Sequence, residues 1–356
     1  MKINFILPIT IIGLAISSCK KDDTTPTEED VTNAQITAAI ALNVNYDIYS
    51  DLSIKSINLY NAVNSFIASP SANGLNDCRN LWKGARSAWE QSEGFLYGPV
   101  ATENIDPRID SWPVDFNAIN ALLAGSTDFT VEANVDALDD ALKGFHPIEY
   151  ILWGETGNKT YSDFTTREKE YLLALANNLK NLTAQLEQQW NTTSSNPYVD
   201  HFTSPSATNP YYATNKAVFE EMVNALIGIC EEVAEGKIGE PFTLQDPSLE
   251  ESPYSSNSIA DFTNNMKSVQ NVYLGKYTSD GYGIEDLVRK HNLSLDNAIK
   301  TKINAAIASL GAVTDPFGTA ISSQQPQVQN AIDAIEDLKN TLETELLPFV
   351  QQHVTN

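Results

Sequence analysis

The chain has 356 residues, of which 42% are hydrophobic and 19% are charged. This composition supports a large buried interior and excludes a disordered, collagen-like or coiled-coil protein for most of the chain. Lys and Arg number 22 against 46 Asp and Glu, a formal net charge of −24, so we expect no nucleic-acid partner. The chain is longer than a single hydrophobic core usually supports, which favours two domains or two similar halves.

The first 18 residues have the pattern of a secretory signal peptide, with a basic second residue and a short apolar run over 3–16. Residues 16–19, Ile-Ser-Ser-Cys, resemble a bacterial lipobox, in which Cys19 is lipidated after cleavage. The polar residues 19–31 then form a tether. The alternative is an ordinary signal peptide in which Cys19 has no role. We predict a protein anchored by lipid to the bacterial cell envelope, at the outer membrane.

Apolar residues recur at helical spacing through most of the remaining chain, and no segment shows the alternation of a β-strand. We therefore predict an all-α fold. Residues 191–212 are rich in Thr, Ser, Asn and Pro, so we expect a connector between an N-terminal bundle, 32–200, and a C-terminal bundle, 201–356. The predicted helices cover 32–68, 75–96, 114–124, 132–143, 147–153, 163–191, 213–235, 257–275, 283–290, 294–311 and 325–353.

The strongest local signal for chemistry lies between residues 144 and 154. His146 and Glu149 are three residues apart, so on a helix they project from one face and can bind the same ion. Pro147 suits the first turn of a helix, and Gly144 lets the backbone approach a neighbour closely. The same spacing also fits a hydrogen-bonded pair on a helix surface, and the pattern alone leaves both interpretations open.

Acidic residues within apolar stretches supply further candidates. Glu93 follows Trp89 by four residues, so we expect it on the core-facing stripe of the predicted helix, with Glu90 pointing elsewhere. A carboxylate directed into a core is costly unless it is paired or binds a metal. Asp110 lies in a short segment bounded by prolines and is another candidate. Its alternative roles are to pair with Arg108 or to cap a helix.

These features occur as a Gly-x-His-x-x-Glu motif over 144–149 and an Ala-x-x-x-Trp-x-x-x-Glu pattern over 85–93. Together they resemble the imelysin-like family, which is also catalogued as a group of metallopeptidases. The similarity continues over 251–275 and spans roughly residues 35–350. It implies an all-helical fold of two bundle-like halves with the motif in a cleft near their junction. It also implies a surface lipoprotein linked to iron acquisition.

The resemblance supports His146, Glu149, Glu93 and Asp110 as the residues of the site. One imidazole and three carboxylates form a hard donor set, which suits iron, manganese or zinc and does not suit Cu(I). We therefore predict that the ligand is a metal ion, iron in the first place, or an iron-bearing molecule. Because His146 must be neutral to bind a metal, binding should weaken as the pH falls through the histidine range.

Two other functions stay open at the level of sequence. A metallopeptidase of the same family is the first, although the chain has no His-Glu-x-x-His element and nothing places another histidine near His146. A non-enzymatic cell-surface scaffold that binds a partner protein is the second. The sequence does not identify that partner.

Overall fold

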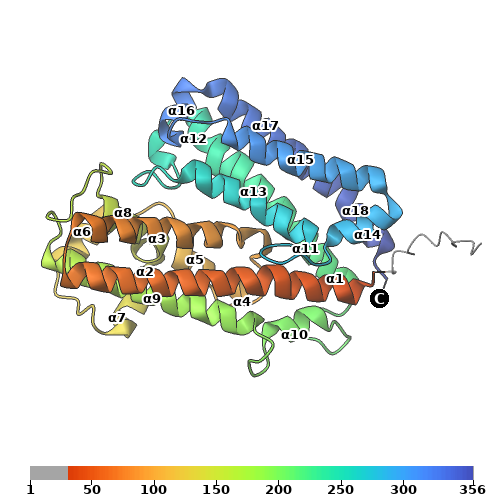
Figure 1. The fold of residues 1–356 in the computed structure, drawn as a ribbon, viewed down its shortest axis with the longest axis horizontal. Helices are drawn as coiled ribbons and strands as arrows, with labels where there is room; N and C mark the ends of the chain where they lie inside the picture. The colour runs from red at the N-terminus through yellow and green to blue at the C-terminus, as the bar shows by residue number, and fades with distance from the viewer. Residues whose placement is uncertain (1–30, 356) are drawn as a thin grey trace, which may run out of the picture. The chain divides into compact units, whose positions relative to one another are not determined.

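The computed structural model describes residues 31–355, and within them helices alternate with loops and no strand occurs (Figure 1). This confirms the predicted all-α fold. The predicted signal peptide and Cys19 lie outside the described residues, as does the tether up to residue 30. None of the helices formed by residues 31–355 combines the length and apolarity that a membrane span requires.

Three long helical segments build the N-terminal layer. The helix predicted over 32–68 is present as α1 (Asn33–Ala39), the π-helical turn η1 (Ile40–Tyr46) and α2 (Asp47–Ala68), which follow one another without a break. α3 (Ala72–Glu90) and α9 (Thr166–Trp190) both pack along α2. The prediction that α3 continues to residue 96 is wrong, because the helix ends at Glu90.

Short helices fill the stretch between α3 and α9. The predicted segment 132–143 forms only two short pieces, whereas the segment predicted over 147–153 begins two residues earlier. These elements are η2 (Glu93–Phe95), α4 (Pro99–Thr102), α5 (Asp106–Asp110), α6 (Phe116–Ala124), α7 (Glu132–Asp136), η3 (Asp140–Leu142) and α8 (Phe145–Trp153).

The C-terminal layer begins after the predicted connector, which itself contains α10 (Tyr198–Thr203). The helix predicted to stop before Gly236 instead continues through it as a π-helical turn, and the sequence did not indicate α16. The elements are α11 (Asn215–Glu231), η4 (Glu232–Gly239), α12 (Glu240–Leu244), η5 (Pro247–Leu249), α13 (Ser258–Leu274), α14 (Ile284–His291), α15 (Leu293–Gly311), α16 (Phe317–Ser323), α17 (Gln325–Thr341), η6 (Leu342–Leu346) and α18 (Leu347–His353).

The two layers meet along α3, which packs against α13, and at η2, which contacts both α11 and α13 (Figure 1). Cys78 of α3 and Cys230 of α11, whose pairing the sequence leaves undecided, are both buried and free. Burial raises the pKa of each thiol to about 12. Both therefore stay protonated and behave as core residues, since a metal binds the thiolate and not the thiol.

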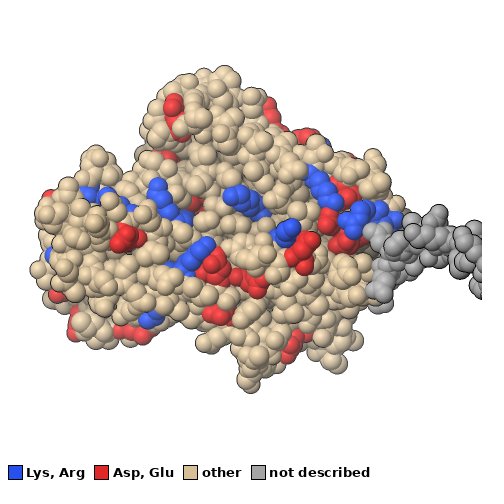
Figure 2. Space-filling model, in the orientation of Figure 1, with Lys and Arg blue, Asp and Glu red and all other residues tan. Residues whose placement is uncertain are grey.

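The face of the molecule shown in Figure 2 carries Lys and Arg side chains beside Asp and Glu side chains across its middle. Among the described residues on this face, the basic side chains do not gather into one continuous patch. A sugar-phosphate backbone binds through such a patch, and this face does not offer one.

Candidate metal centre

The start of α8 places His146 against α5. Gly144 has a φ of +85°, and a Cβ at this position would collide with the backbone carbonyl of Ile109. Glycine alone tolerates both conditions without strain, so α8 can begin directly beside the residue that precedes Asp110. His146 is the second residue of α8, is fully buried, and has its ring 5.0 Å from that of Trp112.

The two imidazole nitrogens of His146 face two different carboxylates. Nε2 lies 3.0 Å from Asp110 Oδ1, and Nδ1 lies 3.7 Å from Glu149 Oε2. Neither nitrogen has the geometry of a hydrogen bond, and Glu149 Oε2 is also buried without such a partner. Nε2 pairs with Asp110 when the imidazole is protonated, and an ion that replaces this proton would find a nitrogen and a carboxylate oxygen side by side. An ion bound to Nε2 would be out of reach of Glu149, on the other side of the ring.

A buried arginine occupies the centre of the cluster. Arg86 of α3 has no exposed side-chain surface and forms an ion pair with Asp110. It also lies 2.6 Å from Glu90 and 2.7 Å from Glu251, and its Nε is 3.6 Å from Asp261. Because a guanidinium keeps its charge when it is buried, Arg86 neutralises part of the acidic cluster in every protonation state.

A second cation reaches the cluster from the C-terminal layer. The ammonium of Lys237, on η4, lies 3.0 Å from Glu93, 3.2 Å from Glu251 and 3.8 Å from Glu90. Glu93 is 5% exposed, which confirms that it points into the core. The expectation that Glu90 points elsewhere is wrong, because Glu90 lies one turn after Arg86 and is completely buried beside it.

The cluster holds more carboxyl groups than fixed positive charges. Burial raises the pKa of Glu90 to about 8, although Arg86 and Lys237 lower it, and burial with the neighbouring Glu90 raises the pKa of Glu93 well above its usual range. The metal-free cluster therefore retains protons. Two cations, Arg86 and Lys237, pair with the five carboxyl groups of Glu90, Glu93, Asp110, Glu251 and Asp261.

The pKa values of His146 and Asp110 are shifted in opposite directions. Burial and the Arg86 charge lower the pKa of His146, but the carboxylates of Asp110 and Glu149 outweigh them and raise it to about 9. Burial raises the pKa of Asp110, whereas Arg86 and His146 hold it well below its usual value. The metal-free site thus contains a protonated imidazole beside an ionised Asp110, and a metal must replace that proton.

Two groups of side chains bring their donor atoms close enough to share one ion. Asp110, His146 and Glu251 form the first group, and Glu90, Glu93 and Asp110 form the second. In each group the donor atoms all lie within 4.8 Å of one another. The structure therefore gathers the predicted residues in one cluster, but it does not place all of them in the same group of donor atoms. Asp110 belongs to both groups, and His146 and Glu93 belong to one each.

Sequence reasoning missed several members of this cluster. Asp110 does not pair with Arg108, which lies 3.4 Å from Asp136. Asp110 instead pairs with Arg86 and accepts a hydrogen bond of 2.6 Å from Trp89 Nε1. The clearest available signal was the run of family-like residues over 251–275, which contains Glu251 and Asp261. The missed residues are Arg86, Glu90, Lys237, Glu251 and Asp261.

Glu149 is held by the loop that precedes α13. Its Oε1 accepts hydrogen bonds from the backbone N–H of Ser255 at 2.7 Å and from the Ser255 hydroxyl at 2.5 Å. These bonds fix the carboxylate while its other oxygen faces His146. The loop therefore joins the C-terminal layer to the motif on α8.

A cavity of about 420 Å³ opens onto the cluster. Its walls combine a few apolar residues, including Trp112, with a strongly acidic lining. Such a lining concentrates cations and repels anions. The charged residues of the lining are Glu93, Asp106, Asp110, Glu232, Glu240 and Glu251 together with Lys237.

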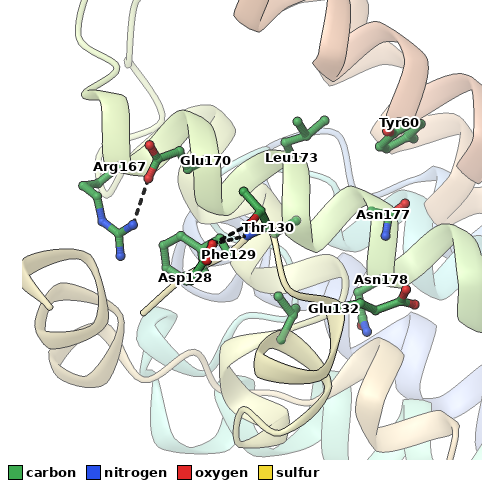
Figure 3. A pocket seen from close by; sticks show the side chains of 12 residues that line it. Tyr60, Asp128, Phe129, Thr130, Glu132, Arg167, Glu170, Leu173, Asn177 and Asn178 are labelled. Carbon is green, nitrogen blue, oxygen red and sulfur yellow. Dashed lines mark hydrogen bonds and ion pairs between the residues drawn. The ribbon is translucent and has the colours of Figure 1, made fainter. Parts of the chain in front are cut away.

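A second cavity, of about 410 Å³, lies between α2, α7 and α9 (Figure 3). Tyr60 of α2 and Asn178 of α9 border it, and Arg167 pairs with Glu170 at 2.8 Å on one side. No residue of the cluster around His146 lines this cavity, so the two places are separate.

Comparison with known proteins gives a consistent assignment. The Imelysin family model matches residues 46–344. Iron-regulated protein A of Synechococcus elongatus is 30% identical over 365 residues, covering 98% of this chain and 96% of that protein. The crystal structure of an iron-regulated protein A precursor from Parabacteroides distasonis has a TM-score of 0.81 and 26% identity, covering 92% of this chain and 97% of that one.

An imelysin-like protein from Psychrobacter arcticum shares the fold, with a TM-score of 0.73, 14% identity, and coverage of 92% of this chain and 99% of that one. The resemblance first indicated by the motif over 144–149 is thereby confirmed. This chain belongs to the Imelysin family.

Proposed function

We propose that this chain is a lipid-anchored protein of the bacterial cell envelope that binds a metal ion, iron in the first place, for iron acquisition. The observation that carries the proposal is the fully buried imidazole of His146, whose Nε2 lies 3.0 Å from Asp110 Oδ1 inside an acidic cluster where donor atoms of Asp110, His146 and Glu251 can share one ion. The names of the relatives in Synechococcus and Parabacteroides describe those proteins as iron-regulated, which supports a role connected with iron.

The donor atoms suit this ligand. Asp110, His146 and Glu251 supply one nitrogen and two carboxylates within reach of one ion, and hard donors of this kind favour iron, manganese or zinc. Glu149 faces the other nitrogen of the imidazole, where a carboxylate commonly orients a metal-bound histidine. A divalent ion would also supply the positive charge that the surplus of carboxylates lacks.

Titration calorimetry with Mn²⁺, and with Fe²⁺ under anaerobic conditions, tests the proposal. Wild type should bind one ion, and His146→Ala should bind it at least tenfold more weakly, about 1.4 kcal/mol. His201→Ala is the control. His201 lies on α10, where its ring packs beside that of Tyr211, so this variant should bind the ion as wild type does. Equal affinity in wild type and His146→Ala would show that His146 does not bind the metal and would contradict the proposal.

Two further results bear on the wider proposal. Incorporation of a fatty-acid analogue in wild type but not in Cys19→Ser would support the anchor, and equal incorporation would reject it. Peptide cleavage that a chelator stops and that Glu149→Gln abolishes would show that the bound metal serves catalysis, and it would replace the role in iron acquisition with the metallopeptidase alternative.

A further inference from the structure

Lys237 holds an unusual position for a lysine. Its side chain is only 10% exposed, although lysine is rarely buried unless it is paired. The ammonium donates hydrogen bonds to Glu93 at 3.0 Å and to Glu251 at 3.2 Å. Each of these carboxylates belongs to one of the two groups that can share a metal ion. Lys237 therefore pairs with the same carboxyl groups that a metal would need.

A metal ion and this ammonium would compete for the same carboxylates. A divalent ion and an ammonium beside the same carboxylates repel each other, and the repulsion is stronger in a buried site than in water because the local dielectric constant is lower. Arg86 is fixed by its own ion pairs deep in the core. Lys237 comes from the wall of the cavity instead, so it is the cation that can leave.

The backbone around Lys237 borders the cavity. Lys237 belongs to the π-helical turn η4, and such turns are frequent at functional sites. Gly236 also lines the cavity, and no atom lies within 4 Å of the place where its Cβ would be. Glu232, whose side chain is 54% exposed, lies 3.4 Å from the ammonium. The lysine therefore has an acidic partner on its way to solvent.

The lining of the cavity restricts what can reach the site. Six acidic side chains and one lysine surround about 420 Å³, and the lysine is already paired. An anionic iron chelate such as ferric citrate would meet repulsion along the whole wall, whereas a hydrated cation would be attracted.

We propose that the site takes a free hydrated metal cation, not an anionic iron chelate, and that this cation displaces the Lys237 ammonium. The proposal rests on the metal-binding function proposed above. In the metal-free protein, Lys237 is the counter-ion of Glu93 and Glu251. When the cation enters through the cavity, the carboxylate of Glu251, which belongs to the group with Asp110 and His146, turns to it, and the lysine moves toward Glu232 and solvent.

Titration of Lys237→Met with Mn²⁺ tests the displacement. Removing the competing charge should tighten binding at least tenfold relative to wild type and lower the melting temperature of the metal-free protein. Lys339→Met is the matched control, because Lys339 pairs with Glu235 of the same turn η4 at 2.7 Å and does not line the cavity. It should bind Mn²⁺ as wild type does. Equal or weaker binding by Lys237→Met would overturn the proposal.

A second measurement needs no variant. An amine-reactive reagent, read by mass spectrometry, should label Lys237 of the wild-type protein several-fold faster when Mn²⁺ is saturating, with labelling of Lys339 unchanged. No increase at Lys237 would contradict its displacement. Ferric citrate should show no saturable binding, and saturable binding of ferric citrate would contradict the cation preference.

The two proposals fail in different ways. If Mn²⁺ binds wild type and its affinity falls in His146→Ala but does not rise in Lys237→Met, the displacement is wrong and the metal-binding function stands. If His146→Ala binds Mn²⁺ as wild type does, the metal-binding function itself is wrong.

Discussion

At the scale of single residues, Gly144 and Asp110 show how the backbone prepares the site. The positive φ of Gly144 and its contact with Ile109 bring the start of α8 next to α5. The side chains of His146 and Asp110 are then in direct contact. The glycine of the motif is therefore a geometric requirement of the site, although it donates no atom to a ligand.

Gly144→Ala should destabilise the protein by about 3 kcal/mol, because it combines strain at a positive φ with a collision against the Ile109 carbonyl. Gly228→Ala is the control. Gly228 lies inside α11 with open space at its Cβ position, so alanine there should stabilise by about 0.5–1 kcal/mol. Urea unfolding of both variants measures the difference, and a Gly144→Ala variant as stable as wild type would contradict this reading of the turn.

Residue chemistry also sets the limit of prediction from sequence. Glu93 is buried as predicted, but not for the predicted reason, because it lies on η2 after the helix has ended and not on a helical stripe with Trp89. The burial of Glu90 could not be predicted, since helical spacing gives a direction but does not reveal a buried arginine one turn earlier. The partners Glu251 and Lys237 come from distant parts of the chain, where no spacing rule connects them to His146.

At the scale of elements, the end of α3 and the loop before α13 decide how the site is assembled. Helical periodicity predicted that α3 would reach residue 96, but it ends at Glu90 and η2 turns Glu93 toward Lys237. A Cβ on Gly94 would come within 2.7 Å of the Ser268 hydroxyl oxygen. Close packing of η2 on α13 is a tertiary effect, and local sequence does not report it.

The loop before α13 should matter for metal affinity through Glu149. Ser255→Ala removes one of the two hydrogen bonds to this carboxylate, and we expect Mn²⁺ affinity to fall by about tenfold, the scale known for groups that orient metal ligands. Ser256→Ala, at the exposed neighbouring residue, is the matched control and should change affinity less than twofold. Calorimetry of both variants measures this, and equal affinities would remove Glu149 from the site.

At the scale of the whole molecule, the fold class and the family could be predicted, and the resemblance implied a motif near the junction of two halves, whereas the residues that meet the motif there could not be predicted. Apolar periodicity identified most long helices, because each buries one face. It also missed the continuation of α11 through Gly236, since a glycine usually ends a helix. That continuation carries Lys237 into the cluster, so the missed element and the missed cation have one cause.

Rising pH should destabilise the metal-free protein. Burial raises the pKa of Glu90 to about 8, of Glu250 to about 7, and of Asp106 and Asp261 to about 6, against about 4 in an unfolded chain. The folded state thus binds more protons between these values, and its stability falls as the pH rises. His146 has the same sign, because its contribution is complete below about 6.5 and is lost as the pH rises through about 9.

The melting temperature of the metal-free protein should therefore fall by several degrees between pH 6 and pH 8.5. Saturating Mn²⁺ should reduce this fall, because the ion replaces the protons of the cluster. Differential scanning calorimetry at both values measures it. A melting temperature that rises with pH in the metal-free protein would mean that the buried carboxyl groups are already ionised.

The central claim is that the buried cluster around His146 binds a metal ion. Anomalous X-ray scattering from crystals of protein purified without chelators, collected on both sides of the iron absorption edge, tests it most directly. We predict an anomalous peak within coordination distance of His146 Nε2 and Asp110, present above the iron edge and absent below it. No peak in the cluster, in crystals that also fail to take up Mn²⁺ there, would contradict the claim.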